Sequence, residues 1–155
     1  MNQEHKNQKA FTLLEILLVI GIIAVLATVV IVSLDPAMRF RDARDSRRLS
    51  DIQSVLSAVH QYIVDNKGAL PPGIDTTERE IGTDGSGCSL STSICGATDC
   101  IDLSTPLARY LKMMPYDPAN GSDAHTHYSV QADSNNIITV RACDSEDATI
   151  ASVSR

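Results

Sequence analysis

The sequence has no tryptophan and only two phenylalanines, and aromatic residues make up 4% of the chain. Its ionisable side chains give a formal net charge of −6. Proteins that bind single-stranded nucleic acid usually combine a basic groove with aromatic rings on which the bases stack. An acidic chain with so few aromatic residues does not indicate nucleic-acid binding, and no nucleic acid is expected among its partners.

Motifs that carry catalysis are also lacking. The sequence contains no glycine-rich phosphate loop, no nucleophile elbow, and no motif that pairs a nucleophile with a base. Its cysteines do not form the paired CxxC pattern of structural zinc sites. We therefore predict that the protein is not an enzyme and needs no cofactor, with calcium as the one metal considered below.

What the sequence does have is a long apolar run. Residues 11–32 are apolar except for Thr12, Glu15, Gly21 and Thr28. At about 1.5 Å per residue, a helix over this run is about 33 Å long, enough to cross a bilayer core of about 30 Å. We predict a transmembrane or assembly helix over residues 11–32, in which the glycine allows either local stretching or close helix packing.

A small residue stands just before this run, not after it. An ordinary secretory signal is cleaved after its apolar region, whereas here Lys6 and Lys9 lead into Ala10 and Phe11. This arrangement resembles the N-terminus of type IV pilins and of type II secretion pseudopilins. The resemblance implies that residues 1–10 are a leader peptide, that a prepilin peptidase cuts between Ala10 and Phe11, and that Phe11 is then N-methylated. The family usually has glycine before the cut, and the alanine found here is also small.

Glu15 is the one carboxylate in the apolar run. A charged side chain within a bilayer costs a few kcal/mol unless it is paired or reaches water. The resemblance implies that Glu15 pairs with the amine of Phe11, in its own chain or a neighbouring subunit, and sets the register during assembly. The alternative is a glutamate that extends to the cytoplasmic interface.

Two sequence signals for the orientation in the membrane disagree. Counting basic residues places the C-terminal domain in the cytosol, because five arginines follow the apolar run: Arg39, Arg41, Arg44, Arg47 and Arg48. The four cysteines instead suit an oxidising compartment. We expect a single-pass protein of the inner (cytoplasmic) membrane, with its leader in the cytoplasm and its C-terminal domain outside.

Residues 33–67 are predicted to continue the helix as an amphipathic segment. Asp35 and Pro36 either cap a new helix or kink a continuous one. Acidic and basic residues at i,i+4 spacing predict a charged, solvated or subunit-facing surface; the pairs are Asp35/Arg39, Arg41/Asp45 and Arg47/Asp51. An apolar stripe at steps of three and four residues is expected to pack on a sheet; it comprises Leu49, Ile52, Leu56, Val59 and Ile63.

Residues 68–155 are predicted to form a globular loop and antiparallel sheet domain. Residues 74–98 indicate a long surface loop with at most a short strand, and residues 102–112 a short helix. Alternation then predicts strands at 128–131, 137–142 and 149–154, the first two joined by a hairpin at 133–136. The fold class is α+β and pilin-like: a long N-terminal helix, first membrane-spanning and then amphipathic, packed on a small antiparallel sheet.

The four cysteines are predicted to form disulfides. Cys88, Cys95, Cys100 and Cys143 permit three connectivities, and their spacing does not choose among them. At least one bridge is expected to join the loop to the sheet, because a small core benefits from such a link.

One late turn carries several oxygen-bearing side chains suited to Ca²⁺. The candidate ligands are Asp117, Asn120, Ser122 and Asp123, and a plain turn is the alternative. His125 and His127 follow this turn without a third ligand at a suitable spacing, so we treat them as surface residues.

The resemblance implies a structural subunit of a type IV pilus-like filament, polymerised through its N-terminal helix and displayed at the cell surface. Its partners would be copies of itself, the prepilin peptidase, a platform membrane protein and an assembly ATPase. Two alternatives stay open. One is a type II secretion pseudopilin, whose periplasmic filament drives protein export and which a calcium site would favour. The other is a single-pass anchored binding domain that never polymerises.

Overall fold

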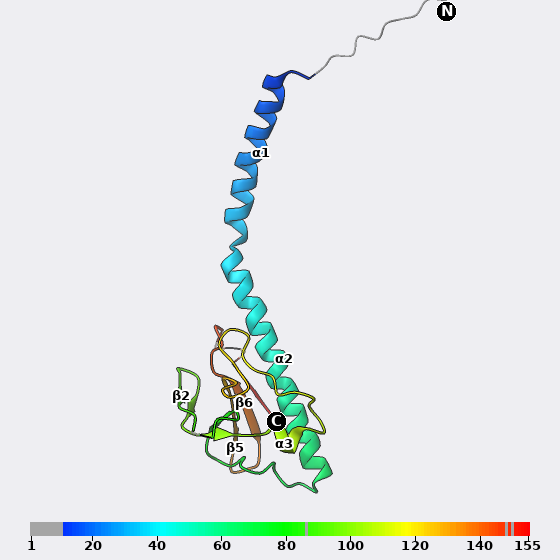
Figure 1. Ribbon diagram of the computed structural model, residues 1–155, viewed down its shortest axis with the longest axis vertical. Coiled ribbons are helices and arrows are strands. Elements are labelled where there is room, and N and C mark those ends of the chain that lie inside the picture. Colours follow the sequence, from blue (N-terminus) through cyan, green and yellow to red (C-terminus); the bar gives the residue numbers. More distant parts are fainter. Residues whose placement is uncertain (1–10, 86, 148, 150) are drawn as a thin grey trace, which may run out of the picture. The chain divides into compact units, whose positions relative to one another are not determined.

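The computed structural model describes residues 11–155, except residues 86, 148 and 150 (Figure 1). The chain divides into two compact units, Met1–Arg39 and Phe40–Arg155. The first contains helix α1 (Leu13–Leu34). The second contains most of helix α2 (Pro36–Asp65) together with the sheet.

Helix α1 has the length and apolarity of a membrane span. In residues 11–32, every large apolar side chain is between 46% and 82% exposed. Within the described residues, one helical stretch, Leu13–Asp65, contains a window apolar enough to cross a membrane, and none of that window is buried. The predicted apolar helix is confirmed, and its large apolar side chains are exposed in the described part of the chain.

The helix is interrupted at Asp35. The backbone of this residue is left-handed, with φ 35° and ψ 78°. Its carboxylate accepts the amide hydrogen of Met38 at 3.4 Å, and Pro36 occupies the first position of α2. Of the two alternatives, the structure therefore shows a new helix that starts at Pro36, a position where proline's missing N–H costs nothing.

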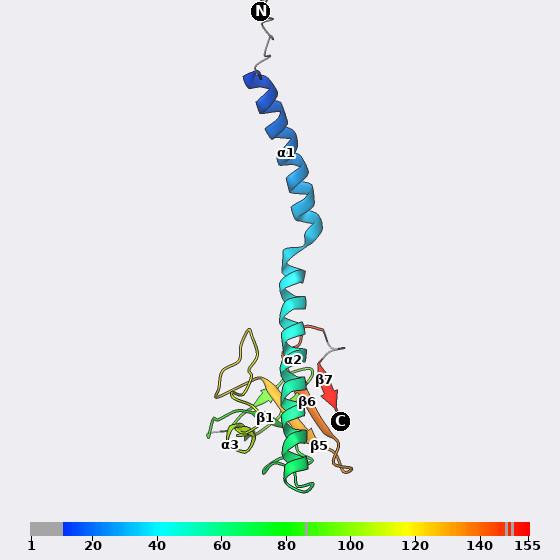
Figure 2. The same ribbon diagram turned by 90° about the vertical axis from the view of Figure 1, so that its right-hand side faces the viewer.

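The predicted apolar stripe of α2 is confirmed. Ile52, Val55, Leu56 and Val59 are buried in one core with residues of the sheet, and Leu49 and Ile63 are partly buried against that core. In Figure 2, α2 passes in front of β5 and β6. The spacing of these residues turns one face of α2 toward the core.

The main sheet has five strands in the order β4-β1-β5-β6-β7. Their bounds are Arg79–Ile81 (β1), Cys100–Ile101 (β4), Tyr128–Ala132 (β5), Ile138–Ala142 (β6) and Ser152–Ser154 (β7). Strand β4 runs parallel to β1, and the other neighbouring pairs are antiparallel. A separate hairpin joins β2 (Leu90–Ser91) to β3 (Gly96–Ala97), and α3 (Ser104–Leu107) is a single turn of helix.

The α+β, pilin-like fold class is confirmed, with three differences from the predicted details. The sheet is mixed and not purely antiparallel, because β1 and β4 form in or beside the segment predicted as loop, and this segment also contains the β2–β3 hairpin. Helix α3 ends at Leu107, not at residue 112, because the chain continues as a turn in which the amides of Tyr110 and Leu111 both donate to the Leu107 carbonyl, and this turn still packs both side chains against the core. Strand β7 is shorter than the predicted 149–154.

Candidate functional site

The N-terminus of α1 is closed by a reciprocal hydrogen-bond pair. The amide and the hydroxyl of Thr12 each donate to Oε2 of Glu15 at 2.9 Å. The amide of Glu15 donates back to the Thr12 hydroxyl oxygen at 3.2 Å. This is a capping box, which satisfies two otherwise unpaired amides of the first turn. Thr12 was not singled out from the sequence, although its T-x-x-E spacing carries the signal.

The predicted processing site lies at the start of the described residues. Ala10 and the rest of the leader are outside them, while Phe11 is described and its side chain is 78% exposed. Cleavage between Ala10 and Phe11 therefore stays a prediction. In the unprocessed chain the Phe11 nitrogen is an amide, so its pairing with Glu15 stays a prediction as well.

A shallow apolar hollow lies on α1 at Gly21. It is lined by Leu17, Leu18, Ile22, Val25 and Leu26. A Cβ added at Gly21 would meet no atom within 4 Å. The missing side chain lets a second apolar helix approach this face closely.

A buried arginine holds α2 to the globular unit. The Arg48 side chain is 2% exposed, and its guanidinium donates from Nη1 to Asp45 at 2.7 Å. From Nε and Nη2 it donates to the two oxygens of Asp117, at 2.5 and 3.2 Å. Burial by itself would raise the pKa of both carboxyls, but the contacts with Arg48 and with backbone amides outweigh it and lower the pKa of each.

The same two carboxylates fix the neighbouring loops. Asp45 accepts the amide hydrogens of Glu146 and Asp147 at 3.1 and 2.8 Å. Asp117 accepts those of Ala119 and Asn120 at 2.8 and 3.0 Å. Together with Arg48, these contacts hold the loop at Ala119 and the loop at Glu146 against α2.

The sequence prediction for the charged part of α2 was only partly right. Arg47 and Asp51 pair at 3.7 Å as expected. Arg41 instead pairs with Glu146 at 3.2 Å. Arg48 belongs to none of the predicted pairs, and it is buried because it precedes Ile52 and Val55 by four and seven residues on the same face.

The side chains of three of the four calcium candidates have other partners. Both oxygens of Asp117 are bonded by Arg48. Asn120 donates its side-chain amide to Asp144 at 2.8 Å. The Ser122 hydroxyl accepts from the His125 amide at 3.2 Å, and the carbonyl of Asp123 accepts from the Thr83 amide at the same distance. A cation at Asp117 would have to displace the guanidinium, so the structure adds no support to the calcium prediction.

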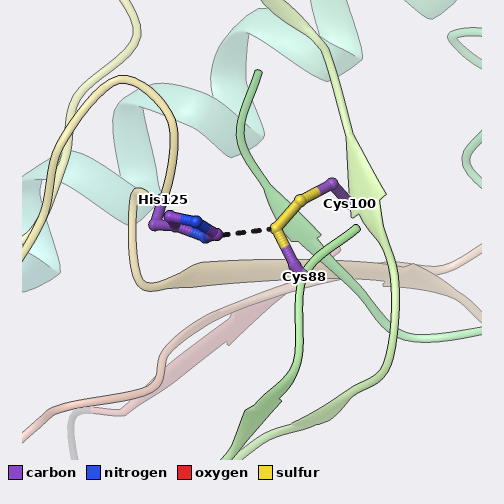
Figure 3. A group of neighbouring side chains, drawn as sticks. All are labelled: Cys88, Cys100 and His125. Atoms are coloured by element: carbon purple, nitrogen blue, oxygen red, sulfur yellow. Dashed lines mark hydrogen bonds between the residues drawn. A yellow bond between two sulfur atoms is a disulfide. The ribbon is translucent and has the colours of Figure 1, made fainter. Parts of the chain in front are cut away.

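The cysteines form two bridges, Cys88–Cys100 and Cys95–Cys143, with Cα–Cα distances of 4.9 and 5.3 Å. The second joins the loop to the residue that follows β6, as expected from the need for a loop–sheet link. His125 is not the plain surface residue that was predicted. Its Nδ1 lies 3.4 Å from Sγ of Cys88 (Figure 3).

Residues 5–31 match the family described as the prokaryotic N-terminal methylation motif. This motif is typical of type IV pilins and pseudopilins, and it implies processing by a prepilin peptidase. No curated protein and no solved structure matches the chain. The chain thus combines a prepilin-type N-terminus, consistent with anchoring in the inner membrane before assembly, with a pilin-like α+β fold.

Proposed function

We propose that this chain is a structural subunit of a type IV pilus-like filament. It is made as a prepilin, cut between Ala10 and Phe11, methylated at Phe11, and polymerised through α1. Its partners are the prepilin peptidase, a platform membrane protein, an assembly ATPase and copies of itself. The observation that carries the proposal is the exposed apolar surface of α1, most of which lies within the methylation motif matched over residues 5–31.

An uncovered apolar helix of this length needs a non-aqueous environment. Exposing apolar surface to water costs about 25 cal/mol per Å², and none of the apolar window of α1 is buried by the residues that the structure describes. In the membrane, lipid covers such a helix. Because lipid tails are as apolar as its side chains, no hydrophobic driving force brings two such helices together there. Once the subunit leaves the membrane, the same helix has to pack against copies of itself.

The contacts of Glu15 support this change of α1 from a helix in the membrane to a helix packed in a filament. In the unprocessed chain its carboxylate is bonded by Thr12, which reduces the cost of holding it near the lipid. Cleavage before Phe11 would create a positively charged amine four residues away. An ammonium is a stronger partner for a carboxylate than a hydroxyl is, so processing gives Glu15 a new contact, in its own chain or in a neighbouring subunit.

The first experiment is the mass of the N-terminus of the full chain, co-expressed with a prepilin peptidase and expressed without it. We expect a chain that begins at N-methylated Phe11 only when the peptidase is present. An intact Met1 in both, with the peptidase active on a control substrate, would overturn the proposal and leave an anchored binding domain.

Assembly is tested by replacing Glu15. We expect Glu15→Ala to insert and to be processed, but to give few or no sheared filaments by electron microscopy. Thr28→Ala is the matched control, because Thr28 is also polar and, among the described residues, its hydroxyl donates to the Ala24 carbonyl of its own helix. Wild-type filaments from Glu15→Ala would contradict the assembly role.

Pilus and pseudopilus are separated by location and by calcium. The engagement of Asp117 by Arg48 supports the pilus subunit over a calcium-binding pseudopilin. We expect surface filaments and no calcium-dependent rise in the melting temperature. A tight calcium site that Asp123→Ala removes, with filaments confined to the periplasm, would favour the pseudopilin.

A further inference from the structure

Three potential metal ligands meet where the loop crosses the end of β1. The Sγ atoms of Cys88 and Cys100 and one ring nitrogen of His125 lie within 4.8 Å of one another (Figure 3). In the oxidised chain the two sulfurs are bonded to each other. Before that bond forms, the same positions hold two thiols beside an imidazole.

We propose that the reduced chain binds one Zn²⁺ through Cys88, Cys100 and Nδ1 of His125, and that disulfide formation releases the metal. Zinc takes thiolate ligands at about 2.3 Å and imidazole at about 2.0–2.1 Å. Tetrahedral geometry then sets ligand atoms about 3.3–3.8 Å apart, and Nδ1 already lies 3.4 Å from Sγ of Cys88. The fourth position is left to solvent.

The second nitrogen of His125 has the partner that a zinc-bound histidine needs. Its Nε2 lies 3.1 Å from Oδ2 of Asp84. A carboxylate that accepts the Nε2 hydrogen fixes the tautomer in which Nδ1 carries a lone pair for the metal. Glu80, whose side chain is 2% exposed, places Oε2 at 3.6 Å from Nδ1, and its negative charge favours a cation there.

The backbone holds these groups in place. Parallel pairing of β1 and β4 sets Cys100 directly opposite Glu80. A Cβ on Gly82 would lie 2.1 Å from the carbonyl oxygen of Ala124, so glycine allows the His125 loop to lie against the end of β1. The amide of Thr126 donates to the Ile81 carbonyl at 3.2 Å. With 40% of the His125 side chain exposed, the metal has a path from solvent.

Metal binding and the later oxidation of the two cysteines need no further cofactor. On binding, the two thiols lose their protons to water and both sulfurs coordinate the metal. On oxidation, an incoming disulfide takes two electrons from the thiolates and two protons from water, and becomes a dithiol. The Cys88–Cys100 bond forms and Zn²⁺ returns to solvent. Until then, coordination keeps these two sulfurs together.

The test uses the full chain in detergent micelles, reduced with a phosphine under anaerobic conditions. Titration with Co²⁺ should give thiolate-to-cobalt absorption at one metal per chain, and Zn²⁺ should abolish it. The oxidised chain should give none. We expect Cys88→Ser and His125→Ala to lose at least tenfold in affinity, and Asp84→Asn to lose about 10–100-fold. His127→Ala and the double variant Cys95→Ser/Cys143→Ser should bind as the parent does.

A reduced chain without thiolate-to-cobalt absorption would overturn the proposal, whether or not circular dichroism shows it folded. Parental affinity in His125→Ala would do so as well, because cysteines of an unfolded chain bind metal without needing this histidine. Neither result bears on filament assembly, which is measured separately.

Discussion

At the scale of single residues, Arg48 ties α2 to the rest of the globular unit. We expect Arg48→Ala to lower the free energy of unfolding by about 3–5 kcal/mol, because it leaves the buried carboxylates of Asp45 and Asp117 without their cation. Urea unfolding of the full chain in micelles, followed by tyrosine near-ultraviolet circular dichroism, measures the loss.

Arg44→Ala is the matched control for this variant. Arg44 pairs with Glu146 at the surface, and exposed ion pairs contribute about 0–1 kcal/mol. The triple variant Arg48→Met/Asp45→Asn/Asp117→Asn should be less destabilised than Arg48→Ala, since no unpaired charge stays buried. Equal losses for Arg48→Ala and Arg44→Ala would contradict the assigned role.

The same cluster predicts an acid dependence of stability. Arg48 and backbone amides lower the pKa of Asp45 and Asp117 below the ordinary 3.8, against the opposing effect of burial. A group whose pKa is lower in the folded state contributes fully above its unfolded pKa, and loses that contribution as the pH falls through the folded value. We expect the free energy of unfolding to fall below about pH 4, and less steeply in Asp117→Asn.

The pKa of Asp51 is raised, so its contribution to stability changes with pH in the opposite direction, and Asp51→Asn serves as the control. Burial raises its pKa, although the Tyr128 hydroxyl, 3.0 Å away, lowers it in part. Its contribution is therefore complete at low pH and is lost as the pH rises through the folded value. Asp51→Asn should steepen the acid loss, and a flatter curve in this variant would contradict the assignment.

At the scale of elements, the two disulfides should differ in their effect on stability. Cys88–Cys100 spans 12 residues and Cys95–Cys143 spans 48. The entropy of the unfolded loops alone predicts losses of about 3 and about 4 kcal/mol when each pair is replaced by alanine. Both members of the longer bridge are also buried, so its removal leaves a cavity as well. Urea unfolding of the two double variants should give this order, and the reverse order would show that strain or residual structure decides.

Elements with a long enough pattern were predictable from the sequence. Strands β5 and β6 each run for five residues, and their joining turn was located correctly. Strands β1 and β4 have only three and two residues, too few for an alternation to be recognised. Their parallel pairing depends on contacts made by the folded unit, so a loop was predicted where the sheet has its edge.

The same distinction holds for the candidate sites. Glu15 and Thr12 are three residues apart, so their contact follows from helix geometry. Arg48 and Asp117 are far apart in the chain, as are Cys88 and His125. Contacts between residues so far apart cannot be predicted from local sequence spacing, because they depend on how helices, strands and loops pack together.

At the scale of the whole molecule, the role of Gly21 in α1 bears on how the proposed filament assembles. The sequence allows two roles for it, close packing and local stretching. Gly21→Ala adds a methyl group that meets nothing within 4 Å and stabilises the helix by about 1 kcal/mol. Gly21→Leu stiffens the helix similarly, but it fills the hollow between Leu17 and Val25.

The two roles therefore predict different filament yields from the full chain. Stretching predicts that both variants assemble poorly, because both stabilise the helix. Packing predicts that only Gly21→Leu fails, because only its side chain holds a neighbouring helix away. We expect the second outcome in sheared-filament assays, with the N-terminal mass confirming that each variant is processed. Ala27→Leu adds similar apolar bulk outside the hollow and should assemble, so that a loss confined to Gly21→Leu identifies this face of α1 as a contact between subunits.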